Sequence, residues 1–224
     1  MNLLMQYEKS IRIMTAAPTM PHRTNNRKTT PKVKNGVVQT KNRQQVTRLN
    51  GLAVGIDKSG GRQVLTKDDA WKFLRLIPDW KRVSTDLDLI YLSGTVAEYE
   101  DGYYEYPSWP TITLNSWEDD LSALILDEEY VRLHRPLLNR LGVEITTGEH
   151  GITKLQFNED NARAWQLLHI FLHELGHHHY RIKHGRDRSA GSEKYAEGYA
   201  FKMEKKVWRR YCEAFDFHPP GSPF

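Results

Sequence analysis

One long helical pattern in this chain runs from Ala162 to about His184 and carries histidine and glutamate inside an apolar stretch. A helix that is apolar around most of its surface has to be buried. We therefore expect this segment to be the central helix of the fold, with Gly185 ending it. Its apolar residues before and within the polar group are Trp165, Leu167, Leu168, Ile170, Phe171, Leu172 and Leu175.

Two histidines of this segment, His173 and His177, are four residues apart. On a helix, this spacing places both imidazoles on one face, where they can reach a single ion. Glu174 projects beside such an ion, which suits a carboxylate that accepts a proton from water better than it suits a ligand. The pattern predicts a catalytic Zn²⁺ site with Glu174 as the general base, which is typical of metallopeptidases.

A catalytic zinc ion takes three protein ligands and leaves a position open, so a further ligand is needed. The metzincin pattern is excluded, because Tyr180 and Lys183 occupy the places of its glycine and third histidine, and His184 misses that register by one residue. The remaining candidates are Glu193 and Glu197, four apart on one face of the last helix. One can bind the metal while the other accepts a hydrogen bond from a ligand histidine.

The two motifs together resemble the glutamate-ligand zinc peptidases, or gluzincins, and within them most closely the ImmA/IrrE-like branch, over about Leu155 to Tyr211. In that branch the His-Glu-x-x-His helix is followed by Glu-x-x-Ala-Asp/Asn-x-Phe-Ala, and this chain has Glu193 to Ala200 in that place. It departs from the pattern at Glu197 and Tyr199. The resemblance implies a zincin-like fold, Glu193 as the third ligand, Glu197 as its supporting or alternative ligand, and a peptide or protein substrate.

Two parts of the expected reaction are less defined. A strand from Ile152 to Phe157 precedes the metal helix and could pair with an extended substrate, although an interior strand would have the same pattern. The group that stabilises the oxyanion is expected among four side chains: His150, Tyr180, Tyr195 and Tyr199. The substrate itself and the choice between endopeptidase and exopeptidase are left open.

The remaining histidines of the helical segments are expected to play structural parts. His169 precedes His173 by one turn and is expected in core packing or beside a ligand. His134 is expected to be partly buried, and His178 and His179 rotate away from the ligand face and are expected to be solvated or structural. His184 lies near the helix end, where its ring can interact with free carbonyl groups.

The fold class is predicted to be α+β, with a small, mostly antiparallel sheet packed on the metal-binding helix and a C-terminal helix. Thr66 and Asp127 precede amphipathic patterns and are expected to cap helices, and residues 158–161 are expected to form the turn and cap before Ala162. The other expected elements are strands near 87–92 (ended by Ser93-Gly94), 103–106, 111–114 and 121–126, a helix ended by Gly142, and a final helix over 192–215.

Charge divides the chain into an arm, residues 1–50, a zincin-like domain, 51–218, and a tail, 219–224. The arm has ten Lys and Arg against one acidic residue, which leaves 22 basic against 27 acidic residues for the rest. From Thr15 to about Asn50 it has almost no large apolar residues, so we expect the arm to be disordered. Such an arm can contact nucleic acid through phosphates, but it lacks stacking aromatics; a solvated tail, or a start at a later methionine, is the preferred interpretation.

A single cysteine, Cys212, excludes an internal disulfide and favours a reducing compartment. No apolar run approaches the roughly 20 residues that a membrane span needs. We therefore expect a cytoplasmic protein that does not enter a membrane. The alternative to a peptidase is a catalytically silent zinc-binding protein whose basic arm contacts nucleic acid or an acidic partner.

Overall fold

The computed structural model divides into two units, Met1–Arg43 and Gln44–Phe224. In the first unit, β1 (Val33–Lys34) pairs with β2 (Val37–Val38) in an antiparallel ladder. The expected disorder of the arm, and the end of the expected tail, otherwise fall outside the described residues. The structure describes residues 33–34, 37–38, 47–49, 51–96, 101–106, 109–148, 151–185 and 190–220.

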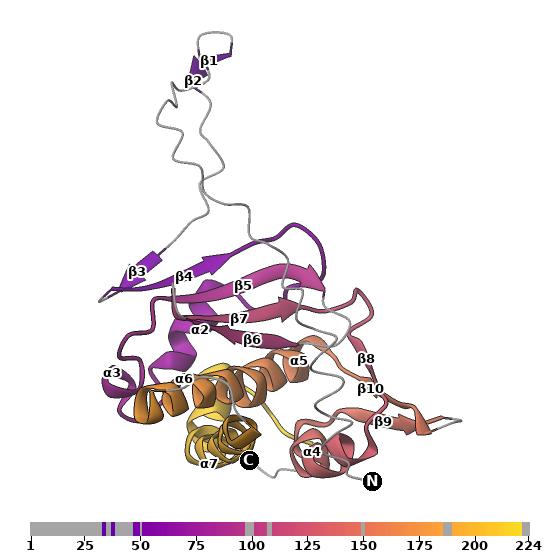
Figure 1. The fold of residues 1–224 in the computed structure, drawn as a ribbon. Helices are drawn as coiled ribbons and strands as arrows, with labels where there is room; N and C mark the ends of the chain where they lie inside the picture. The colour runs from indigo at the N-terminus through magenta and orange to yellow at the C-terminus, as the bar shows by residue number, and fades with distance from the viewer. Residues whose placement is uncertain are drawn as a thin grey trace. The chain divides into compact units, whose positions relative to one another are not determined.

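The second unit is a mixed helix-and-sheet structure built on a five-stranded sheet (Figure 1). Its strand order is β3-β4-β5-β7-β6, and its members are β3 (Thr47–Leu49), β4 (Leu52–Ile56), β5 (Leu89–Val96), β7 (Thr111–Ser116) and β6 (Gly102–Glu105). The two central pairs, β4 with β5 and β5 with β7, are parallel, while the outer pairs are antiparallel. The prediction of a mostly antiparallel sheet is therefore wrong for the two central pairs of strands. The reason is that neither central pair is a direct hairpin: a helical crossover joins β4 to β5, and β6 lies between β5 and β7 in the chain.

The β5 strand continues through Ser93-Gly94 instead of ending there. Its register with β7 shifts between Leu92 and Val96. At this point the N–H of Gly61 donates to the carbonyl of Gly94 at 2.9 Å, and a Cβ on Gly94 would lie 2.2 Å from the Ser59 carbonyl oxygen. The glycine therefore permits a close backbone approach within the strand, so the expected strand end is wrong.

Among the described residues, three shorter helices precede residue 159, and two of them follow local signals. α2 (Lys67–Leu74) begins with a capping box between Thr66 and Asp69, as predicted. α3 (Trp80–Val83) is a short helix in the same crossover. α4 (Glu128–Leu141) is capped by the Asp127 side chain and ends at Gly142 in a left-handed conformation, which confirms both expected boundaries.

A separate three-stranded antiparallel sheet has the order β8-β10-β9, with β8 (Ser122–Ile125), β10 (Thr153–Gln156) and β9 (Glu144–Thr147). The middle strand, β10, pairs on both sides. A strand with two partners has no free edge to offer. The expectation that an extended substrate pairs with this strand is therefore wrong.

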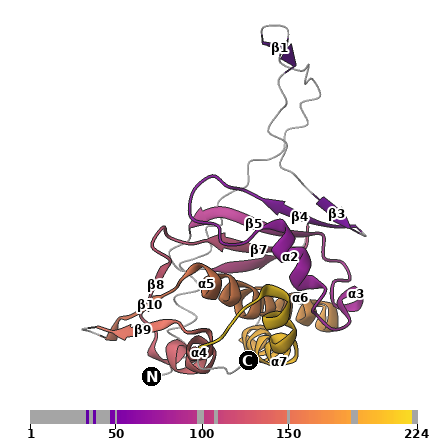
Figure 2. The same ribbon diagram turned by 180° about the vertical axis from the view of Figure 1, so that it is seen from behind.

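The C-terminal half is helical. α5 (Glu159–Trp165), capped by Asn158, continues through a π-helical segment (Gln166–Phe171) into α6 (Leu172–His184), and Gly185 ends α6 as predicted. The π-helical register was not predicted. α7 (Ala190–Phe215) packs against α6, and these helices lie together on one side of the five-stranded sheet (Figures 1 and 2). No helix in the described ranges is long and apolar enough to cross a membrane.

One buried cluster joins the sheet to these helices. Ile90, Ile112 and Leu114 of the sheet are fully buried in the same cluster as Leu172 and Leu175 of α6. Burial of such side chains contributes about 1.5 to 3 kcal/mol each relative to exposure, which anchors α6 firmly. Side chains on the opposite face of α6 are thus held at defined positions toward α7.

Candidate metal centre

The two motif histidines meet on the face of α6 that is turned toward α7. His173 Nε2 and His177 Nε2 lie 3.1 Å apart. Their side chains keep 19% and 12% of their surface exposed, so small molecules can reach them. Two imidazole nitrogens at this separation are stabilised by a cation that both can contact.

Glu193, at the start of α7, completes a group of three. Its Oε2 lies 3.4 Å from His173 Nε2, and its Oε1 lies 3.4 Å from His177 Nε2. Ligand atoms around a tetrahedral zinc ion are about 3.4 Å apart when the bonds are about 2.1 Å long. The three side chains could therefore hold a metal ion, and their donor set of two nitrogens and one carboxylate suits Zn²⁺.

The second ring nitrogen of each histidine has its own acceptor. His173 Nδ1 lies 2.9 Å from Glu197 Oε2, and His177 Nδ1 lies 2.7 Å from the buried Ser192 hydroxyl. With the proton on Nδ1 and donated to these oxygens, each Nε2 keeps the lone pair that a metal requires. Glu197 thus lies behind His173, whereas Glu193 faces both Nε2 atoms.

The charges around His173 favour a protonated imidazole next to ionised carboxylates. Burial lowers the pKa of His173, but contacts with Glu193 and Glu197 and the nearby charge of Glu174 outweigh it and raise the pKa to about 10. For Glu193, burial raises the pKa, yet His173 and His177 outweigh this and hold it below its usual range. The cluster therefore attracts a cation, and His173 carries that charge as a proton when no metal is present.

The close approach of α6 and α7 brings these residues together. Gly176 faces Ala196, and a Cβ added to Gly176 would lie 2.7 Å from Ala196 Cα. Only a glycine allows the backbones to come this near. Because Ala196 lies between Glu193 and Glu197 on α7, this contact sets how deeply both carboxylates reach toward α6.

Glu174 is buried, with 8% of its surface exposed, and lies close enough to His173 for its charge to raise the histidine's pKa. It belongs to the same turn of α6 as the two histidines. The structure therefore brings all five residues singled out in the sequence, His173, Glu174, His177, Glu193 and Glu197, into one region.

The remaining polar candidates are placed elsewhere or fall outside the described residues. Tyr195 OH lies 2.7 Å from His179 Nδ1, and burial raises the pKa of Tyr199 to about 12. Tyr180 packs its ring against His184. His150 falls outside the described residues. No described contact links these tyrosines to the ligand atoms, so the oxyanion donor is not assigned.

Most of the histidines that were expected to play structural parts are buried. His178 is fully buried between the Tyr104 hydroxyl, 3.2 Å from Nδ1, and the Thr85 carbonyl oxygen, 3.0 Å from Nε2, so it is structural and not solvated. His184 Nδ1 lies 3.1 Å from the Tyr180 carbonyl oxygen, which precedes the last four carbonyl groups of α6 and so is not one of the free groups that were expected. His134 is fully buried, not partly, and its Nε2 contacts Glu197 Oε1 at 2.8 Å.

No family model, curated protein or solved structure matches this chain. What the chain does is therefore inferred from the chemistry of these side chains and from the resemblance of its two motifs.

Proposed function

We propose that this chain is a zinc-dependent metallopeptidase with a zincin-like fold, of the gluzincin type and closest to the ImmA/IrrE-like branch. The observation that carries the proposal is the position of Glu193, whose two oxygens each lie 3.4 Å from Nε2 of one motif histidine. His173, His177 and Glu193 would hold the ion. Glu197 would orient His173, and Ser192 would orient His177.

A zinc ion held by three protein side chains lowers the pKa of water and polarises a carbonyl group. Glu174 is the residue that accepts the proton of the attacking water, and it can later donate that proton to the leaving amine. Its burial beside His173 suits both steps, because the exclusion of bulk water limits loss of the proton to solvent between them. The Nδ1 hydrogen bonds of the two histidines keep their rings fixed during the reaction.

The edge strand β6 is the element best placed to hold an extended peptide. In the described part of the chain it pairs only with β7, and it lies beside α6 (Figure 1). Tyr104 joins the two, because its hydroxyl contacts both His178 and Arg181 of α6. An extended substrate can add to such an edge through backbone hydrogen bonds.

Replacing Glu174 by Gln tests the proposed chemistry. The substitution keeps the size of the side chain but removes its ability to accept a proton. We expect peptide hydrolysis to fall by about a hundredfold or more, with one zinc ion still bound between His173 and His177. Turnover would be measured on a peptide library, and zinc by mass spectrometry.

The matched control is Glu213→Gln, an exposed glutamate that pairs with Arg209 near the end of α7. This variant is expected to keep full turnover. Hydrolysis that survives in Glu174→Gln contradicts the mechanism. Zinc bound without turnover in the wild type favours the alternative, a catalytically silent zinc protein.

A further inference from the structure

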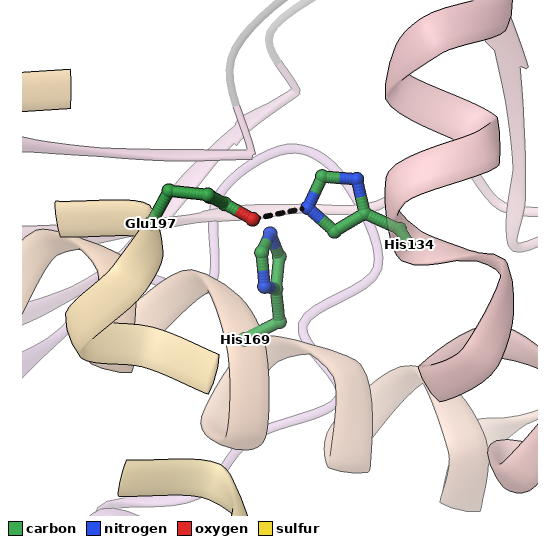
Figure 3. Close-up of side chains that lie close together, drawn as sticks. All are labelled: His134, His169 and Glu197. Atoms are coloured by element: carbon green, nitrogen blue, oxygen red, sulfur yellow. Dashed lines mark hydrogen bonds and ion pairs between the residues drawn. The ribbon is translucent and has the colours of Figure 1, made fainter. Parts of the chain in front are cut away.

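Three side chains from different helical segments meet next to the first metal centre. His134 comes from α4, His169 from the π-helical segment and Glu197 from α7, and Figure 3 shows them pointing toward one another. One potential ligand atom of each lies within 4.8 Å of the others. We propose that they form a second binding site for a divalent transition-metal ion such as Zn²⁺.

The hydrogen bonds of His134 define which of its nitrogens is available. Its Nδ1 lies 2.7 Å from the Tyr130 carbonyl oxygen. A carbonyl oxygen can only accept, so Nδ1 carries a hydrogen and donates it. Donation of this second N–H to a backbone carbonyl is the usual arrangement for a histidine that binds metal through its other nitrogen.

The available nitrogen of His134 faces a carboxylate. Its Nε2 lies 2.8 Å from Glu197 Oε1 (Figure 3). In a neutral imidazole with the hydrogen on Nδ1, Nε2 is an acceptor, and two acceptors at this distance repel each other. A cation has to lie between them, either a proton or a metal ion.

The position of His169 favours a metal ion, and not a proton, as the cation between His134 and Glu197. It is buried, with 3% of its surface exposed, and Figure 3 shows one of its ring nitrogens turned toward Glu197 and His134. Its ring lies 4.3 Å from the His134 ring, centroid to centroid, at an interplanar angle of 72°. A proton shared by His134 and Glu197 would leave this second imidazole unused, whereas a metal ion can accept lone pairs from both rings and the carboxylate.

The chemistry of the three donors indicates the kind of ion. Two imidazoles and one carboxylate are the ligands of Zn²⁺ and similar first-row ions, not of Ca²⁺ or Mg²⁺. The His134 and Glu197 atoms are closer than the roughly 3.4 Å expected around a tetrahedral ion, so binding separates them by about half an ångström. Glu197 keeps its other oxygen, Oε2, on His173 Nδ1 and so links the two centres.

Zinc content of the tag-free full chain tests the proposal. The protein would be saturated with Zn²⁺, treated briefly with a moderate chelator, desalted and measured by mass spectrometry. We expect two zinc ions per chain in the wild type. His169→Leu should retain one, in the first centre, and the double variant His173→Ala, His177→Ala should also retain one, in the second.

The control is His184→Ala, because His184 is an exposed histidine at the end of α6. Its zinc content should equal that of the wild type, which separates the buried site from surface histidines. If His169→Leu does not fold, as judged by circular dichroism, His134→Gln replaces it, and it is expected to lose the same one zinc ion.

If the wild type binds only one zinc ion, and the His173→Ala, His177→Ala variant binds none, the second site is overturned and the first site stands. Two ions that both persist in His169→Leu also overturn it, since the second ion is then elsewhere. If the wild type binds one zinc ion, and this ion persists in the double variant but is lost from His169→Leu, the result supports the second site and contradicts the first.

Discussion

Gly176 of α6 lies so close to Ala196 of α7 that a methyl group on Gly176 would come within 2.7 Å of the Ala196 Cα. This contact brings the carboxylates of α7 within reach of the histidines of α6. A substitution at Gly176 should therefore act on the proposed metal centre without removing any of its proposed ligands.

Gly176→Ala is expected to push the two helices apart. Overpacking of this kind costs about 1 to 3 kcal/mol of unfolding free energy, and zinc affinity should fall by about tenfold or more as Glu193 withdraws. The control is Gly198→Ala on α7, where an added Cβ meets nothing within 4 Å. That variant should gain up to about 1 kcal/mol. Denaturant unfolding and competitive zinc titration measure both quantities, and equal behaviour of the two variants would contradict the packing argument.

Ser192→Ala removes the oxygen that lies 2.7 Å from His177 Nδ1. Loss of such a support weakens metal binding by about 10- to 100-fold. The fold should be kept, because the change is small and the backbone of α7 is unaffected. Competitive zinc titration measures the loss, with the neighbouring exposed Lys194→Ala as control. An unchanged affinity in Ser192→Ala would show that Ser192 does not orient His177.

Zinc binding is expected to release a proton at about pH 7.5. His173 has its pKa raised to about 10, so it is protonated in the metal-free protein, and its Nε2 must lose that proton to bind zinc. The proton competes with the metal, so affinity should rise about tenfold for each pH unit up to about 10. Calorimetry in buffers of different ionisation enthalpy counts the protons. A count near zero would contradict the protonated state of His173.

Tyr104→Phe tests the connection between β6 and α6. The Tyr104 hydroxyl accepts from Arg181 Nε at 2.6 Å and donates to His178 Nδ1 at 3.2 Å, while His178 Nε2 donates to the Thr85 carbonyl. Burial lowers the pKa of His178 to about 4, so the ring is neutral and can accept.

Removing that hydroxyl leaves the buried His178 and the partly buried Arg181 without this partner, so the unfolding free energy should fall by about 1 to 3 kcal/mol. Tyr106→Phe serves as the control, because Tyr106 is half-exposed and its contact with the Arg181 guanidinium is through the ring. Denaturant unfolding compares the two variants. An equal, negligible effect of both would mean that the hydroxyl network contributes nothing to stability.

The parts of the structure that sequence could predict are local. The caps at Thr66 and Asp127, and the cap expected within residues 158–161, follow from side chains that bond to backbone within three residues. The pairing of His173 with His177 follows from helical periodicity, which is set by the geometry of a single turn. These signals are complete within a few neighbouring residues.

The parts that sequence could not predict depend on distant partners. The hydrogen bond of His134 to Glu197 joins residues 63 apart, and that of His177 to Ser192 joins residues 15 apart. No periodic pattern marks either pair. Likewise, the parallel centre of the sheet depends on which strands become neighbours, and a short apolar run around Ile90 or Ile112 looks the same in a parallel or an antiparallel pair.

The central claim is that one zinc ion is held by His173, His177 and Glu193. An anomalous difference map from crystals of the zinc-loaded chain, recorded at the zinc absorption edge, tests it most directly. The account predicts a peak about 2.1 Å from Nε2 of each histidine and from one oxygen of Glu193. No peak between these atoms, or a peak bound by Glu197 in place of Glu193, would contradict it.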